Sequence, residues 1–211
     1  RLGFSKSGYL PEYYPDQLDV FNADDVTIAS GTSVSGRNAV LAAGSQPPNG
    51  TLSGTVTSDD SGLGVANVRV VAWRCDPISY PDGWYWANST QTGGGGGYSM
   101  SLMPGVYRIQ FSDQQQPVRF LSEYHEDAEA TGATHVTVLS GSTTTVDAGL
   151  ATGGAIAGTV TDEMSGTPLE GVYVYVYARF GAYLYQVAWT STGADGTYTA
   201  GGLPTGAYVA Y

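Results

Sequence analysis

The sequence contains one cysteine, Cys75, one lysine, Lys6, and no hydrophobic run long enough to span a membrane. A single cysteine excludes an internal disulfide, so a disulfide-stapled scaffold is excluded as well. Cys75 is expected to be a buried thiol on a strand, with an intermolecular bridge as the alternative. No signal peptide is recognisable and the first residue is Arg1, so we interpret the chain as a mature or excised piece.

Positive charge is also scarce. Lys and Arg together number 8 against 19 Asp and Glu, which gives a net charge of -11. The seven arginines are scattered along the chain, whereas phosphate contacts need clustered Lys and Arg, so nucleic acid is excluded as a partner. An acidic, lysine-poor, Ser- and Thr-rich surface is typical of secreted proteins and predicts an extracellular or cell-surface location.

Long runs with helical periodicity are absent. Instead, short β-branched and aromatic runs alternate with Gly, Pro, Asp and Ser, and the chain has 30 Gly and 16 Tyr. This pattern predicts an all-β fold.

Two sets of segments repeat along the chain. LSGTVTSDDSG from Leu52 matches IAGTVTDEMSG from Ile156, and YSMSLMPGVY from Tyr98 matches YTAGGLPTGAY from Tyr198. YLPEYYPD (9–16) matches FLSEYHED (120–127), and VTIASGTS (26–33) matches VTVLSGST (136–143). The period is roughly one hundred residues, which is the size of one β-sandwich domain.

The repeats predict tandem Ig-like or prealbumin-like β-sandwiches, one complete and two partial. Residues 1–44 form the C-terminal part of one repeat, 50–150 a complete repeat, and 154–211 the N-terminal part of another. A half-sandwich exposes an apolar face and an unpaired edge. Three interpretations stay open: a window on a longer tandem array, strand complementation between neighbouring copies, or a fragment with disordered ends.

Alternation of apolar and polar residues predicts the strands of the complete repeat. They are expected at 51–58, 66–74, 84–91, 97–102, 105–112, 118–124, 134–139 and 144–150. The run TGGGGG (92–97) is expected to be a flexible loop, because its counterpart TGADG needs fewer glycines. Gly31 and Gly141 are expected at positive φ in hairpin turns.

Two aromatic groups are the candidate interaction sites. Trp84 and Trp86 are predicted to share one face of a strand, either as a sugar-stacking platform or as core and interface packing. In the run GVYVYVYARF, Val172, Val174 and Val176 alternate with tyrosines. The tyrosine face packs on another domain or chain, or is merely amphipathic. Its residues are Tyr173, Tyr175 and Tyr177.

Catalytic and metal-binding motifs are missing. His125 and His135 are assigned structural roles, since Tyr14 occupies the position of His125 in the first repeat. No His/Cys metal spacing and no nucleophile motif occur, so we expect no enzyme, no cofactor and no metal. The acidic runs around Asp16 and Glu126 are interpreted as solvated loops, with a calcium site as the alternative.

Asn49 and Asn88 begin N-glycosylation triplets, NGT and NST. They predict two sites of glycan attachment on condition that the producing cell glycosylates proteins in this way.

The motifs of the third segment resemble the carboxypeptidase regulatory-like domain, a transthyretin-like β-sandwich related to the collagen-adhesin B-type repeats of bacterial surface proteins. The matching residues are Gly158, Val160, Asp162, Pro168, Gly171, Asp195, Gly196, Tyr198, Leu203, Pro204, Gly206 and Tyr208. The middle repeat matches at Gly54, Val56, Tyr98, Leu102, Pro104, Gly105 and Tyr107. The resemblance implies a spacer, stalk or accessory module. B-type repeats often carry a lysine isopeptide bond, which the lysine-free middle repeat cannot form.

Taken together, the sequence predicts a structural repeat of an extracellular filament, sheath or stalk whose partners are copies of itself. The alternative is an adhesin or carbohydrate-binding accessory module, with glycans as ligands.

Overall fold

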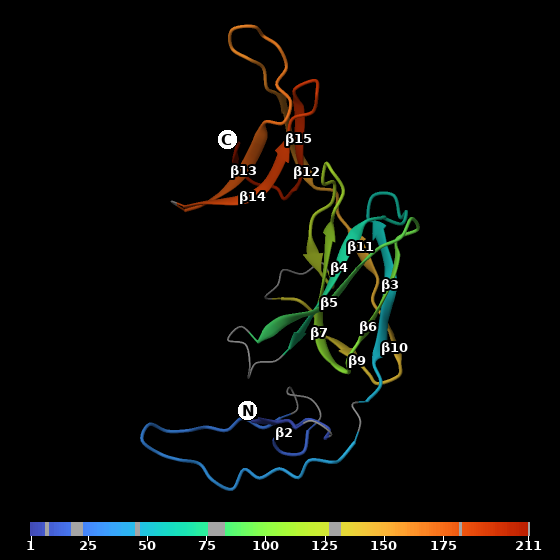
Figure 1. Ribbon diagram of the computed structural model, residues 1–211, viewed down its shortest axis with the longest axis vertical. Helices are drawn as coiled ribbons and strands as arrows, with labels where there is room; N and C mark the ends of the chain where they lie inside the picture. The colour runs from blue at the N-terminus through green and yellow to red at the C-terminus, as the bar shows by residue number, and fades with distance from the viewer. Residues whose placement is uncertain are drawn as a thin grey trace.

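The computed structural model describes residues 1–6, 9–17, 23–44, 47–75, 83–126, 132–181 and 183–210. Within these ranges all regular secondary structure is β-strand, which confirms the all-β prediction. No helix in the described part has the length and hydropathy needed to cross a membrane. Figure 1 shows the N-terminal segment, a central set of strands and a C-terminal set following one another along the long axis.

The central part is a sandwich of two sheets. One sheet has the order β10-β3-β11 with β6 on the other edge of β3, and the second has the order β5-β4-β7-β8 with β9 also on β7. The strands are β3 (Gly50–Ser58), β4 (Val68–Cys75), β5 (Trp84–Gln91), β6 (Gly97–Leu102), β7 (Gly105–Asp113), β8 (Glu123–Tyr124), β9 (Val136–Val138), β10 (Thr143–Thr145) and β11 (Ala148–Leu150).

Most strand predictions for this part are confirmed, and those at 84–91 and 97–102 agree to the residue. The prediction at 144–150 was wrong in detail, because the segment forms two short strands on β3. Between them, the Asp147 carboxylate accepts the Thr55 amide at 2.8 Å, in the place where a strand carbonyl would otherwise pair.

The predicted strand 118–124 is shorter than expected. Within this segment only Glu123 and Tyr124, which form β8, pair with β7. Phe120 forms an isolated bridge with Thr152 instead. The Asp113 carboxylate accepts the amides of Gln115 and Arg119, each at 2.9 Å. These side-chain bonds satisfy backbone donors that a continuous ladder would use.

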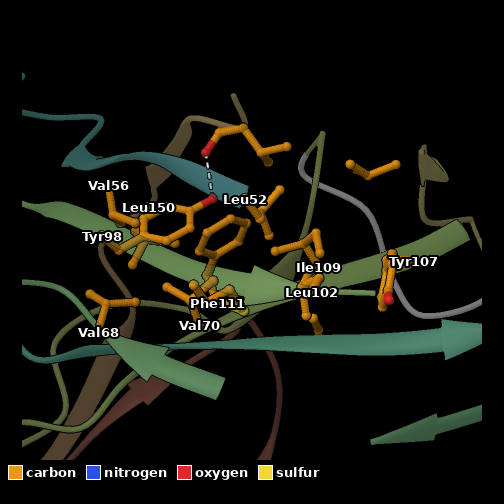
Figure 2. Close-up of a cluster of buried hydrophobic side chains, with 14 of the residues drawn as sticks. Leu52, Val56, Val68, Val70, Tyr98, Leu102, Tyr107, Ile109, Phe111 and Leu150 are labelled. Carbon is orange, nitrogen blue, oxygen red and sulfur yellow. Dashed lines mark hydrogen bonds between the residues drawn. The ribbon is translucent and has the colours of Figure 1, made fainter. Parts of the chain in front are cut away.

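A single apolar core lies between the two sheets. Alternate residues of β4, such as Val68, Val70 and Ala72, face inward, as period-2 alternation requires. Figure 2 shows Tyr98 beside Phe111 in this core, and their rings meet edge to face with centroids 6.1 Å apart. The Tyr98 hydroxyl donates to the Val146 carbonyl at 2.6 Å, which ties the closing segment to the core.

The C-terminal part repeats the first five strands of the central sandwich. It contains β12 (Gly154–Thr159), β13 (Tyr173–Phe180), β14 (Tyr183–Ser191), β15 (Thr197–Leu203) and β16 (Tyr208–Ala210). β12 pairs with β15, and β13 pairs with both β14 and β16. The buried core here is small and consists of Val176, Ala200 and Leu203.

The N-terminal segment contains one short hairpin, β1 (Gly3–Phe4) with β2 (Glu12–Tyr13). From 24 to 42 the described chain carries no strand, and most of its side chains are exposed. Gly31 and Gly141 have φ values of +75° and +64°, which confirms the predicted positive φ. The predicted hairpins were wrong, because no strand of the described chain flanks Gly31 and the strands on either side of Gly141, β9 and β10, pair with different sheets.

The glycine run at 92–97 is a defined turn, so the prediction of a flexible loop was wrong. The Gly93 amide donates to Gly97 at 3.0 Å and the Gly96 amide donates to Gly93 at 2.9 Å. Gly96 has φ +80°, and an added Cβ would lie 2.2 Å from the Val56 carbonyl oxygen. Glycine at this position is therefore required by sterics.

Candidate functional site: aromatic faces and open strand edges

The first candidate surface is the outer face of the five-stranded sheet. Trp86 pairs with Trp73 and Trp84 with Cys75, so both tryptophans of β5 lie on the same face, as predicted. Trp86 is 52 % exposed. The Trp73 indole nitrogen donates to Gln110 Oε1 at 3.1 Å.

Trp84 is covered rather than open. The Arg108 guanidinium carbon lies 4.1 Å from the centroid of the Trp84 ring, and the His135 ring centroid lies 5.1 Å away. A cation over a tryptophan face is a favourable arrangement. Trp84 and Trp86 therefore do not form a two-ring platform with both faces free, and Trp84 belongs to a packed cluster.

Partial desolvation shifts the pKa of two groups beside this cluster, His135 and Tyr124. Burial, and then the Arg108 charge, lower the pKa of His135. Burial raises the pKa of the Tyr124 phenol, and the Arg108 charge opposes that shift. The lowered pKa favours the neutral form of His135 beside the Arg108 cation.

The second candidate surface is the outer face of β13 and β14. Tyr173 is 61 % exposed, its ring is stacked on Tyr175 at 6.3 Å, and it meets Trp189 at 6.0 Å. Tyr177 continues the same row and is half-buried. On the opposite face Val174 and Val176 are buried. The predicted alternation is confirmed, and the tyrosine face is open in the isolated chain.

The two asparagines of the glycosylation triplets both bond to Ser101 of β6, Asn49 from just before β3 and Asn88 from β5. Asn49 is exposed, and its amide nitrogen donates to Ser101 Oγ at 3.0 Å. The amide nitrogen of the half-buried Asn88 donates to the Ser101 carbonyl at 3.1 Å. Both amide nitrogens, the atoms to which a glycan would be attached, are hydrogen-bonded, and Asn49 is the more exposed of the two side chains.

The acidic runs were the candidate calcium sites. Among the residues that the structure describes, no group of three His, Cys, Asp or Glu side chains is placed to hold a metal ion. Asp19, Asp127 and Glu129 belong to these runs and lie outside the described residues. Asp25 forms an ion pair with Arg1 at 2.9 Å.

A buried threonine anchors the strand pairs in both sandwiches, and sequence reasoning missed it. Thr92 Oγ1 donates to the Val65 carbonyl at 2.6 Å and accepts the Val68 amide at 2.9 Å. Thr192 makes the same two bonds, to Leu169 and Val172, at 2.6 and 2.9 Å. The sequence signal that could have predicted this anchor is the dipeptide Thr-Gly, which directly follows both β5 and β14.

A tyrosine closes the turn that follows in each sandwich. The Tyr107 hydroxyl donates to the Met103 carbonyl, and the Tyr208 hydroxyl donates to the Pro204 carbonyl, both at 2.5 Å. With the threonine anchor, these bonds align β3 to β7 with β12 to β16 residue by residue.

The edges of the second sandwich differ from those of the first. In the first, β10 and β11 pair with β3 and β9 pairs with β7. In the second, β15 is the one strand of the described chain that pairs with β12, and β13 is the one that pairs with β16. Ile156, Tyr198 and Tyr208 are partly exposed, whereas their counterparts in the first sandwich are buried. These counterparts are Leu52, Tyr98 and Tyr107.

We call the segment that leads from one repeat to the next a junction, and the same backbone contacts are found at two such places. The Leu10 amide donates to the Ala42 carbonyl and the Leu121 amide to the Ala151 carbonyl, both at 2.9 Å. The bridge Tyr9–Ala43 corresponds in the same way to the bridge Phe120–Thr152. The segment that links one repeat to the next is therefore tied to the same place in both.

The next sandwich packs closely on the second junction. The Gly153 amide donates to the Arg119 carbonyl at 2.8 Å. An added Cβ on Gly201 would lie 2.1 Å from the Val118 carbonyl oxygen. At the first junction, Leu10 and Pro11 line a pocket together with Met103, Pro104 and Gly105.

The fold and its repeated anchors define an all-β protein of β-sandwich type. Residues 155–210 match the model of the carboxypeptidase regulatory-like domain, which confirms the resemblance for this segment. The comparison with curated proteins gave no match.

Several solved structures are similar to this chain. A streptococcal ancillary pilin has 14 % identity and a TM-score of 0.41, over 82 % of this chain and 55 % of the pilin. The TIE protein of Bacillus anthracis has 16 % identity and a TM-score of 0.35, over 76 % of this chain and 27 % of that protein. The shaft pilin SpaA of Lactobacillus rhamnosus GG has 12 % identity and a TM-score of 0.32, over 78 % of this chain and 86 % of the pilin. This chain thus spans about half of the ancillary pilin.

Proposed function

We propose that this chain is a structural repeat of an extracellular or cell-surface filament, sheath or stalk. Its work is mechanical: sandwich modules follow one another along one axis and hold a fixed spacing. The observation that carries the proposal is the repeated junction, in which Leu10 with Ala42 and Leu121 with Ala151 make the same bond. The linker thus leaves both segments in the same way, and units joined through one linker geometry extend in one direction.

Three further observations support a mechanical role. The close approach of Gly201 to Val118 leaves no room for a side chain, so this junction is packed and not a loose linker. The charge of -11 favours a soluble, exposed surface. The family match at 155–210 is to the carboxypeptidase regulatory-like domain, whose resemblance implies a spacer, stalk or accessory module.

The proposal is tested on the native source with antibodies raised against the central sandwich. Intact cells should be labelled, the label should follow extended surface structures in electron micrographs, and mild protease treatment of intact cells should remove it. Label that appears only after the cells are broken open would contradict the proposal.

A second function is favoured by one observation. The row of Tyr173, Tyr175 and Trp189 exposes aromatic faces, which are the groups that stack on sugars. A carbohydrate-binding accessory module would use this row. Binding to a glycan array that Trp189→Ala abolishes, and that Thr137→Ala on the exposed surface of the central sandwich leaves unchanged, would support this function. An array with no binding would exclude it for the glycans tested.

A further inference from the structure

The central sandwich shows what completes a repeat of this kind. After β7, residues 136–150 return to the sheets: β9 pairs antiparallel with β7, and β10 and β11 pair parallel with β3. Val138 and Leu150 from this closing segment are fully buried in the core. The segment also accepts the Tyr98 hydroxyl through the Val146 carbonyl.

The second sandwich has the sites for such a segment. Within the part of the chain that the structure describes, β12 and β16 each have one edge without a strand partner. The Tyr198 hydroxyl, counterpart of the Tyr98 hydroxyl, has no hydrogen-bond acceptor among the described residues. Leu169 is exposed where its counterpart Val65 is buried.

Residues 26–41 have the sequence of a closing segment but do not act as one in their own chain. VTIASGTS matches VTVLSGST of the central repeat, and NAVLA (38–42) matches DAGLA (147–151). Ile28 is 65 % exposed, whereas its counterpart Val138 is fully buried. The segment carries no strand in this chain, although its counterpart forms three.

We infer that residues 26–41 of a second copy of this chain close the sandwich formed by residues 154–210. This inference rests on the proposed function and names its partner. The central sandwich sets the register. Val26 and Ile28 of the second copy lie antiparallel to Tyr208 and Gly206, as Val136 and Val138 lie opposite Tyr107 and Gly105. Edge strands that remain unpaired are ready templates for such pairing.

The parallel half of the contact follows in the same way. Val40 of the second copy lies opposite Thr161, as Gly149 lies opposite Thr57. Asn38 takes the place of Asp147, whose carboxylate accepts the Thr55 amide, so the Asn38 amide oxygen accepts the amide of Thr159. The sequence change from Asp to Asn keeps the acceptor that this position requires.

Each copy then donates one closing segment and accepts one. The donor site lies near the N-terminus and the acceptor site near the C-terminus, so the contact is head to tail. Such a contact generates an open chain of copies when the rotation between them does not close.

The register is tested by cross-linking in the full 211-residue chain with Cys75→Ala as background. One preparation carries Val40→Cys and a second carries Thr161→Cys. Mixed and treated with a short bismaleimide, they should give a cross-linked pair of two chains on a denaturing gel. The matched control replaces Thr161→Cys by Ser191→Cys, which is equally exposed but lies on β14, and should give none. Cross-linking no stronger than in this control overturns the inference.

A second measurement separates burial at the contact from folding of the chain. Ile28 and Thr27 are both exposed in the isolated chain, but Thr137, the counterpart of Thr27, stays exposed in the closed sandwich. In a sedimentation series at rising concentration, the wild-type chain and Thr27→Asp should form multimers, and Ile28→Asp should lose them. Multimers that survive Ile28→Asp, or a wild-type chain that stays monomeric throughout, would overturn the inference. Surface labelling of cells would be unaffected by either result, so the proposed function stands or falls separately.

Discussion

The Tyr107 hydroxyl donates a hydrogen bond to the Met103 carbonyl oxygen, 2.5 Å away, and closes the turn between β6 and β7. Because Tyr107 is buried, Tyr107→Phe leaves that carbonyl without its partner. The free energy of unfolding should fall by about 1 kcal/mol in urea titrations followed by fluorescence. Tyr173→Phe, on the exposed outer face of β13, serves as control and should change it by less than about 0.5 kcal/mol. Equal effects would show that the turn bond does not stabilise the fold.

The same tyrosine predicts a loss of stability in alkali. Burial raises the pKa of Tyr107 to about 12, against 10.0 for the free side chain. Above pH 10 the unfolded chain releases this proton while the folded chain keeps it, so rising pH favours unfolding until the folded group also titrates near pH 12. The slope is about 1.4 kcal/mol per pH unit for each tyrosine held in this way.

Denaturation series at fixed pH between 9 and about 12 measure this slope. Tyr107→Phe removes one of the titrating groups and should flatten the profile. Tyr98, whose pKa burial and the Asp147 charge also raise, should keep part of the slope in that variant. A wild-type profile that is flat above pH 10 would contradict the account.

Replacing the buried Thr92 should lower the stability of the fold more than the small size of its side chain suggests. Thr92→Val keeps the shape of the side chain but leaves the Val65 carbonyl and the Val68 amide unpaired in the core. We expect the free energy of unfolding to fall by about 2 kcal/mol or more. Thr143→Val, on the exposed surface of β10, should change it by less than about 0.5 kcal/mol. If both variants unfold alike, the threonine is not an anchor.

A substitution at Gly201 tests whether the second sandwich is packed against the junction in solution. Gly201→Ala places a Cβ 2.1 Å from the Val118 carbonyl oxygen, so the second sandwich must shift away from the junction. Small-angle X-ray scattering should show a larger radius of gyration for this variant at low concentration. Gly193→Ala has Asp195 Oδ1 as its nearest atom at 3.4 Å and should scatter like the wild type. Identical curves for all three chains would mean that the junction is not packed in solution.

Period-2 alternation was enough to predict the strands and their inward faces, because each strand of a sandwich buries one side. It placed β5 and β6 to the residue and predicted that valines and tyrosines of β13 lie on opposite faces. Internal repetition was enough to align the two sandwiches, and the anchors at Thr92 and Thr192 follow that alignment.

Features that depend on one side chain reaching a distant backbone were not predictable. The Asp147 carboxylate that splits the last strand and the Asp113 carboxylate that shortens 118–124 act on residues the pattern does not connect to them. The cation–π contact of Arg108 with Trp84 was not predicted either, because the two residues lie on different strands, β7 and β5, that the sequence pattern does not connect. The ordered glycine turn was misread because composition alone does not reveal φ.

We propose above all that sandwiches of this chain follow one another in a single direction with the same junction each time. Electron microscopy of the purified full chain at high concentration tests it most directly. The account predicts unbranched filaments one sandwich wide, with an axial repeat of two sandwiches per chain, the second of which is shared between copies. Compact closed particles, or single chains at every concentration, would contradict it.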